Sequence, residues 1–263
     1  MSTTNLASPI VFKLGGEALT DKVALAEFLQ QIAKIKQTRP VVIVHGGGPQ
    51  VEEMMLATQL DTTKVDGVRA TPLTHLPFVV GALAGVASQQ LLAACKSLQV
   101  NAVALSLADA DLFDAHIKSE KLGAVGEVQP NNPSAINALL DNGFVVLINS
   151  IGCDANGQTL NINADDAAVA TAKLLQADLC LLSNVAGVLD AEKQLIQSLD
   201  KESISNLIHT GVIRDGMVVK VNAAYDAARL LRRPVHIGSW QDSNALNKLH
   251  LSEQIQLGTQ INA

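Results

Sequence analysis

The sequence has 263 residues, enough for one large α/β domain or two small lobes that share a core. Its net charge of −6 argues against a nucleic-acid partner, because a phosphate backbone requires a basic face, and against adhesion to an anionic membrane. Hydrophobic residues make up 48% of the chain and aromatic residues only 3%. An interior built from alanine, valine, leucine and isoleucine is typical of a buried parallel sheet flanked by helices.

The sequence carries no obvious export or membrane signal. Residues 1–9 lack the charged head and apolar core of a signal peptide. The most apolar long stretch, 78–94, is interrupted by polar side chains at 88–90, and we expect it to be too polar for a membrane span. Three cysteines without a CxxC pair are expected to be small buried residues in a soluble cytoplasmic protein: Cys95, Cys153 and Cys180.

Strands and helices alternate from the start of the chain. Residues 10–14 have the pattern of a buried strand that ends in two glycines, and residues 23–36 have apolar positions at helical spacing. A second strand is predicted over 41–45, ending in three glycines, and Pro49 fits the first turn of a helix that reaches about residue 60. This β-α-β-α beginning predicts a parallel, doubly wound sheet.

The same alternation continues to the end of the chain. The predicted elements are a hairpin over 62–71 with its turn at Asp66-Gly67, a long helix over 73–98, a strand over 102–107, an irregular or antiparallel stretch over 109–129, a helix over 133–142, a strand over 144–150, a turn at 154–157, a helix over 165–175, a strand over 178–182, helices over 203–209 and 220–231, and a strand over 234–239. The predicted fold class is α/β, with an open, mainly parallel central sheet sandwiched by helices. Composition alone marks no domain boundary.

Two strand-to-glycine junctions give the strongest chemical signal. The first reads KLGG over 13–16 and the second HGGG over 45–48. In an open α/β sheet, ligands bind outside the carboxyl ends of the strands, where bare glycine amides and a helix N-terminus favour an anion. Two junctions together fit a polyphosphate, although each alone could be a tight turn. Walker A, dinucleotide and protein-kinase motifs are absent from the sequence, so phosphate binding would need another arrangement.

Several charged and polar side chains are candidates for the chemistry. Lys13 lies in an apolar strand, where a lysine is costly unless it has an anionic partner. Lys220 is expected in the first turn of a helix, and Asp165 either caps a helix or orients cationic groups. Arg69 could bind a carboxylate through two hydrogen bonds or be solvated on its hairpin, and Asn161 could reach a ligand.

Taken together, these motifs resemble the amino acid kinase family from about residue 9 to the end of the chain. KLGG and HGGG are shared across that family, whereas GVRATP over 67–72 and NINAD over 161–165 resemble its acetylglutamate branch. DGM over 215–217, followed by Lys220, completes the pattern. The resemblance implies ATP-dependent phosphorylation of the γ-carboxylate of N-acetyl-L-glutamate, an early step of arginine biosynthesis, with Mg²⁺ carried mainly by the ATP.

The resemblance also implies roles for single residues. Lys13 would bridge the transferring phosphoryl group, Lys220 would neutralise charge on the nucleotide side, and Asp165 would organise both lysines. The amide of Gly16 would contact the phosphoryl group. The acceptor would be held by Gly47, Gly48, Arg69 and Asn161, with Arg69 on its α-carboxylate. The adenine and ribose pocket would be lined by Asn184, Val185, Ala186, Gly187, Val188, Leu189, Val212, Ile213 and Arg214.

Organisation and assembly follow from the same resemblance. It implies an acetylglutamate-binding and dimerisation lobe over 1–175, an ATP-binding lobe over 176–263, and a homodimer formed through the helix over 73–98. The mechanism needs no general base, because a carboxylate acceptor is already ionised at neutral pH. His45 is accordingly interpreted as a strand-end residue rather than as a base.

Two alternatives stay open at this stage. The same fold could act on N-acetyl-aminoadipate, carbamate or aspartate. Arg69 and the Asn161 segment argue against carbamate, which has no α-carboxylate, whereas N-acetyl-aminoadipate is one methylene longer than N-acetylglutamate and the sequence barely separates the two. The chain could also be a non-catalytic nucleotide-binding regulator, against which Lys13, Asp165 and Lys220 argue. Asn184 stands where the family often has aspartate, which retains a hydrogen bond but loses a charge.

Overall fold

The computed structural model describes residues 8–65, 68–251 and 255–263. Its framework is an eight-stranded sheet in the order β12-β14-β13-β11-β1-β2-β8-β5. Neighbouring strands pair in parallel, apart from the antiparallel pair β13 and β14, so the predicted mainly parallel α/β fold is confirmed. The strands are β1 (Ile10–Leu14), β2 (Val41–His45), β5 (Ala102–Ser106), β8 (Val145–Asn149), β11 (Asp178–Ser183), β12 (Ser198–Leu199), β13 (Val235–Ser239) and β14 (Thr259–Ile261).

β1 lies where the strand order changes direction. It pairs with β2 on one side and with β11 on the other, so that Lys13 lies between Val44 and Leu181. The chain leaves β1 toward β2 and reaches the other side only in its last third. Ligands of open α/β sheets bind at such a point, outside the carboxyl ends of the strands. The glycines that follow β1 and β2 therefore lie where a ligand is expected.

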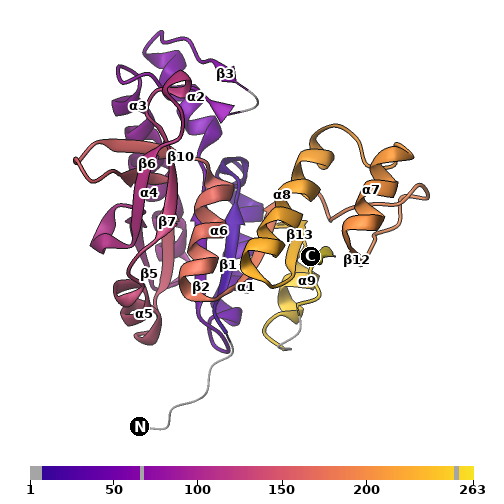
Figure 1. Ribbon diagram of the computed structural model, residues 1–263. Coiled ribbons are helices and arrows are strands. Elements are labelled where there is room, and N and C mark those ends of the chain that lie inside the picture. Colours follow the sequence, from indigo (N-terminus) through magenta and orange to yellow (C-terminus); the bar gives the residue numbers. More distant parts are fainter. Residues whose placement is uncertain (1–7, 66–67, 252–254) are drawn as a thin grey trace.

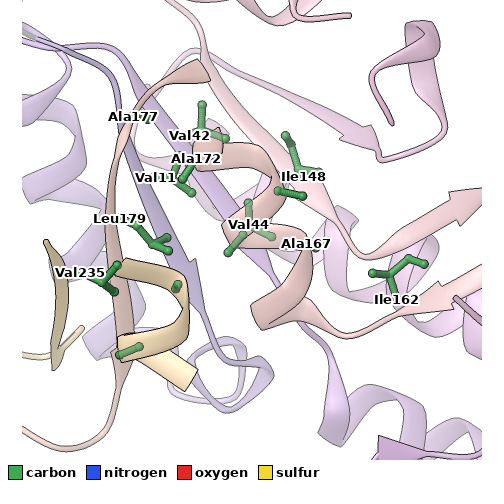
Figure 2. Packing of buried hydrophobic residues seen from close by; sticks show 14 of the residues in the cluster. Val11, Val42, Val44, Ile148, Ile162, Ala167, Ala172, Ala177, Leu179 and Val235 are labelled. Atoms are coloured by element: carbon green, nitrogen blue, oxygen red, sulfur yellow. The ribbon is translucent and has the colours of Figure 1, made fainter. Parts of the chain in front are cut away.

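Helices cover both faces of the central sheet (Figure 1). The residues of β1 alternate between the two layers: Val11 packs in one core cluster, and Ile10, Phe12 and Leu14 pack in the other. Figure 2 shows Val11, with its neighbours in β2 and β11, against the alanines of one helix. One layer contains α5 (Ser134–Asp141), α6 (Ala164–Leu175) and α8 (Asp215–Leu231), and the other contains α1 (Lys22–Ile35), α4 (Ser88–Ser97) and α9 (Ser243–Lys248).

This alternation decides where Lys13 points. Side chains two residues apart in a strand share a face, so Lys13 shares the face of Val11, which α6 covers. α6 is rich in alanine, and its buried Ala167, Ala168 and Ala172 let the helix approach the strands closely. The N-terminus of α6 is thereby brought to the carboxyl edge of the sheet, beside the lysine.

A second, smaller sheet stands beside the first. Its strands are β6 (Phe113–Ile117), β7 (Val125–Pro130), β9 (Ile151–Cys153) and β10 (Thr159–Ile162), in the order β6-β7-β10-β9. β6 and β7 are antiparallel, which confirms the antiparallel excursion predicted over 109–129. The hairpin of β3 (Lys64–Val65) and β4 (Val68–Arg69) lies near α2 (Gly48–Ala57) in Figure 1. Its predicted turn at Asp66-Gly67 lies outside the described residues.

The long helix runs without interruption over Leu76–Ser97. It consists of α3 (Leu76–Val80), a π-helical segment over Gly81–Ala87, and α4. An 18-residue window of this helix has a mean hydropathy of 1.6, so by length and composition alone it could cross a membrane, and the expectation that the segment is too polar is wrong on composition. Its contacts are those of a core helix, because one side is buried in the fold through Ala82, Leu83, Ala87, Leu91 and Cys95.

The C-terminal third departs from the prediction in its details. α7 spans Lys201–His209, but α8 begins at Asp215, so Lys220 lies in its second turn rather than opening it. β12, β14 and α9 were not predicted, because segments of two to six residues are too short to show a period. Cys95 and Cys180 are buried as expected, whereas Cys153 is only partly buried. Burial raises the pKa of the Cys95 thiol to about 12, so this thiol stays protonated at neutral pH.

Candidate functional site

A cavity of about 260 Å³ opens at the carboxyl edge of the central sheet. Parts of the chain that are distant in sequence converge on it: the ends of β1 and β2, the hairpin strand β4, β7, β10 and the start of α6. Every predicted acceptor residue and three of the predicted catalytic residues line it. Its walls include Lys13, Gly16, Gly47, Gly48, Val51, Arg69, Leu83, Val125, Ser150, Asn161 and Asp165.

The two glycine junctions touch one another at the floor of this cavity. A Cβ atom on Gly16 would lie 2.7 Å from the Cα of Gly47 and 2.8 Å from the amide nitrogen of Gly48. Neither junction can therefore carry a side chain at this contact without a shift of backbone. Among the described residues, the amides of Gly16, Gly47 and Gly48 have no hydrogen-bond acceptor. Free amides beside the start of a helix form an anion-binding concavity.

Lys13 finds the anionic partner that its apolar strand requires. Its Nζ lies 3.0 Å from Oδ1 of Asp165, in the first turn of α6, and the two side chains are 18% and 45% exposed. Asn163 caps α6 by accepting a hydrogen bond from the amide of Asp165 at 2.7 Å. The cap is therefore Asn163, and the Asp165 carboxylate is free to face the lysine. Because this ion pair is partly solvated, it contributes little to the free energy of unfolding. Its main effect is to hold the charged end of Lys13 at the edge of the cavity.

Lys220 lies next to this ion pair in a smaller cavity. That cavity, of about 100 Å³, is lined by Lys13 and Asp165 from one side and by Lys220 from α8. The Nζ of Lys220 donates a hydrogen bond to Oγ of Ser183 at 3.2 Å. The structure thus brings both lysines to Asp165, although in the described chain only Lys13 forms an ion pair with it. Ser183, at the end of β11, was not identified from the sequence.

Arg69 and Asn161 line the cavity of about 260 Å³ from β4 and β10. Arg69 is 13% exposed, and its Nη2 lies 3.1 Å from Oε1 of Glu52 in α2. Asn161 donates from Nδ2 to Oγ1 of Thr71 at 3.0 Å. Both side chains are thus held by a neighbour while they face the cavity. Glu52 and Thr71 were not identified from the sequence, because their roles arise only when the hairpin folds back.

Asp166 connects the N-terminal end of α6 to the second sheet. Its carboxylate lies 3.5 Å from Nζ of Lys118, which is also 3.2 Å from Glu127 in β7. Burial raises the pKa of Asp166, a change that the charge of Lys118 opposes. The contact joins the sheet that forms one wall of the cavity to the turn that carries Asp165. Lys118 and Asp166 also lie outside the residues identified from the sequence.

His45 is a structural residue, as the sequence suggested. It is fully buried at the end of β2, with Nδ1 3.0 Å from the Gly46 oxygen and Nε2 3.0 Å from Oγ of Ser88. Burial lowers its pKa, so the ring is neutral near pH 7. It anchors the second glycine junction to the long helix and does not face the cavity.

The residues predicted for the nucleotide pocket follow β11 and precede α8. Val188 and Ile213 belong to the same buried core cluster, and the Val188 amide donates to Oγ1 of Thr259 at 2.8 Å. Gly187 has φ 151°, a conformation that glycine adopts readily. Of the rest, Val185 and Val212 are half-buried, and the exposed residues are Asn184, Ala186, Leu189 and Arg214. Their contact with a nucleotide stays a prediction.

A chain that gathers lysines and free amides at the carboxyl edge of a doubly wound sheet is built to hold phosphoryl groups. The profile described as "Amino acid kinase family" matches residues 8–239. The protein therefore belongs to the amino acid kinase family.

Individual relatives agree with this assignment. An acetylglutamate kinase from Shewanella denitrificans is 44% identical over 255 residues, which cover 97% of each chain. Among solved structures, smu.665 from Streptococcus mutans UA159 has a TM-score of 0.79 and 29% identity, over 97% of this chain and 98% of that one. The N-acetylglutamate synthase from Neisseria gonorrhoeae in complex with coenzyme A and N-acetyl-glutamate has a TM-score of 0.81 over 98% of this chain and 60% of its own, and at 20% identity it supports the fold alone.

Proposed function

We propose that this protein transfers the γ-phosphoryl group of ATP to the γ-carboxylate of N-acetyl-L-glutamate. The products are N-acetylglutamyl 5-phosphate and ADP, and the reaction is an early step of arginine biosynthesis. The 44% identity to an acetylglutamate kinase supports the substrate. The observation that carries the chemistry is the Lys13–Asp165 ion pair of 3.0 Å, which lies between a cavity with an arginine and free amides and a second cavity with Lys220.

The acceptor cavity matches the charges of N-acetylglutamate. Arg69 would bind the α-carboxylate, and Asn161 would bind the N-acetylated end of the molecule. Gly47 and Gly48 would donate their amides to the γ-carboxylate at the foot of the cavity. That carboxylate is ionised at neutral pH, so it attacks the phosphorus without a general base. The new bond forms between a carboxylate oxygen and phosphorus, while the bond from phosphorus to the β,γ-bridging oxygen breaks.

Charge neutralisation supplies the rate enhancement in this mechanism. Lys13 and the Gly16 amide would contact the phosphoryl group in flight, and Lys220 would neutralise charge on the leaving nucleotide. Asp165 would keep Lys13 extended from its strand. Groups fixed before the reaction stabilise developing charge without reorganising, which makes them effective in phosphoryl transfer. Magnesium would arrive mainly on the ATP and supply further positive charge.

The division of labour along the chain is part of this proposal. Residues 1–175 contribute the acceptor cavity, Lys13 and Asp165, and residues 176–263 contribute Lys220 and the segments proposed for ATP, 184–189 and 212–214. We further propose a cytoplasmic homodimer formed through the long helix. Its small residues and the 38% exposed Val86 would allow close approach of a second copy.

A coupled assay of ADP release tests the proposed function. N-acetylglutamate, glutamate and N-acetyl-aminoadipate are compared side by side, each with and without the protein. We expect turnover with N-acetylglutamate to exceed the other two clearly. Equal rates with N-acetyl-aminoadipate would overturn the choice of acceptor. ATP binding without turnover on any acceptor would instead favour a nucleotide-binding regulator.

A further inference from the structure

Glu52 makes the contact that orients Arg69. Glu52 lies in the second turn of α2, and its Oε1 is 3.1 Å from Nη2 of Arg69. The two partners differ in their surroundings, because the arginine side chain is 13% exposed and the glutamate side chain 57% exposed. The mostly buried guanidinium of Arg69 is thus held by a carboxylate, that of Glu52, which is largely exposed to solvent.

The guanidinium of Arg69 is only partly satisfied by the protein. Its Nη1 is buried and has no hydrogen-bond partner among the described residues. A buried donor without a partner costs free energy, which an incoming acceptor would recover. Since Arg69 lines the cavity while Glu52 does not, the bond to Glu52 occupies one edge of the fork and leaves Nη1 for another acceptor.

The position of Glu52 on α2 links two parts of the acceptor cavity. The helix begins at Gly48, Val51 lines the cavity, and Glu52 is the next residue. The same helix therefore presents the free glycine amides and fixes the arginine. Lys64, opposite Arg69 in the hairpin, also approaches Glu52, at 3.9 Å. Both partners of that longer contact are more than half exposed, so water screens it and it contributes little.

We infer that Glu52 is a positioning residue that sets the affinity for the acceptor through Arg69. The inference rests on the proposed function, in which Arg69 binds the α-carboxylate. A free arginine side chain loses rotamer freedom on each binding event unless a partner fixes it beforehand.

The charge of Glu52 also has an effect of opposite sign on acceptor binding. Its negative charge competes with the substrate carboxylate for the same guanidinium and repels that carboxylate. Because the glutamate side chain is 57% exposed, water screens its repulsion of the substrate carboxylate, whereas its contact with the mostly buried arginine is a direct hydrogen bond of 3.1 Å. The two effects predict opposite changes in acceptor affinity when Glu52 is removed. If Glu52 positions Arg69, its removal weakens acceptor binding. If Glu52 competes with the acceptor, its removal strengthens acceptor binding.

Steady-state kinetics of Glu52→Ala and Glu52→Gln distinguish these effects. We expect Glu52→Ala to raise KM for N-acetylglutamate about tenfold, the scale of one hydrogen bond to a charged group, with KM for ATP unchanged and kcat changed less than KM. Glu52→Gln retains an acceptor oxygen, so its KM should rise less. Glu53→Ala, on the adjacent exposed residue, is the matched control and should leave KM unchanged.

A double-mutant cycle with Arg69→Met shows whether the effect passes through the arginine. In that background Glu52→Ala should have little further effect on KM, because the group it positions is gone. A KM that falls in Glu52→Ala, or an equal further rise on top of Arg69→Met, would overturn the inference. Wild-type protein without turnover on N-acetylglutamate would overturn the proposed function itself, so the two failures are distinguishable.

Discussion

The two edges of the central sheet each hold a cation paired with an aspartate, and they use it differently. At the amino edge, the guanidinium of Arg39 is 2% exposed and contacts Asp178 at 2.5 Å. The same side chain donates to the backbone oxygen of Ser8 at 3.0 Å and 2.7 Å. At the carboxyl edge, Lys13 and Asp165 are 3.0 Å apart, more exposed, and surrounded by free amides.

This contrast between the two edges separates residues that serve stability from residues available to a ligand. At the amino edge, Nε and Nη2 of the Arg39 guanidinium have partners from the chain itself, Asp178 and Ser8, and only Nη1 is buried without a partner among the described residues. At the carboxyl edge the positive groups exceed the partners that the chain provides, and an anionic ligand would complete the set. Substitutions at one edge should therefore change folding, and substitutions at the other should change turnover. Four predictions test this separation.

The largest effect is expected for Lys13→Ala at the carboxyl edge. Removal of one preorganised charge from the transition state should lower kcat at least ~100-fold. The free energy of unfolding should change little, because the ion pair with Asp165 is partly solvated. Lys22→Met, on an exposed lysine at the start of α1, is the control. Unchanged turnover in Lys13→Ala, measured with saturating ATP and N-acetylglutamate, would contradict the proposed mechanism.

At the amino edge, Arg39→Met should act on stability instead. Breaking a buried ion pair leaves Asp178 without its principal partner, so the free energy of unfolding should fall by about 3 kcal/mol. Urea denaturation measures this change, and kcat per folded molecule should be retained. Arg233 contacts Asp178 at 3.5 Å and is 39% exposed, so Arg233→Met should cost under ~1 kcal/mol. Equal losses of unfolding free energy in Arg39→Met and Arg233→Met would contradict the expectation that the buried ion pair contributes more than the exposed one.

A smaller loss of turnover is expected for Gly16→Ala. Its new Cβ would lie 2.7 Å from the Cα of Gly47, so the two glycine junctions must separate. Displaced amides should reduce kcat about tenfold, because positioning errors of this kind weaken transition-state contacts. Gly15→Ala is a matched control, since no atom lies within 4 Å of its Cβ. The idea that this contact shapes the site fails if both variants behave alike.

The fourth prediction concerns the pH dependence of folding. Burial lowers the pKa of His236 to about 4, whereas an unfolded histidine titrates near 6.5. The unfolded chain therefore binds more protons between these values, and the stability contributed by neutral His236 is present above pH 6.5 and lost as the pH falls toward 4. His236→Gln should reduce the slope of unfolding free energy against pH by up to about 1.4 kcal/mol per unit in this window. An unaltered slope in urea titrations between these pH values would contradict the assignment.

Local sequence patterns were sufficient to predict the central strands of the sheet. β1 and β2 occupy the predicted residues because a short apolar run that ends in glycine is stable as a buried central strand of a parallel sheet. α8 was predicted to begin at Lys220, but it begins at Asp215, since the first turn of this helix shows little apolar periodicity. β12 and β14 were missed because they have two and three residues and exist through long-range pairing.

The candidate site was predictable where chemistry and motif coincide. Lys13 is conspicuous in an apolar strand, and the glycine junctions indicate an anion site by their residue types and spacing alone. Glu52 and Ser183 have no such signal, because a glutamate on a helix and a serine after a strand are common surface residues. Their contacts with Arg69 and Lys220 depend on how the hairpin and α8 fold back, which spacing in the sequence does not encode.

The central place of β1 has a consequence for how the protein is made. The first strand synthesised pairs with β2 soon afterwards, but its other edge remains open until β11 has left the ribosome, when more than half of the chain has been translated. During that interval an apolar strand edge is available to other chains. The strand that carries Lys13 therefore acquires its second neighbour only late in translation, and protection of its open edge until then would limit association with other chains.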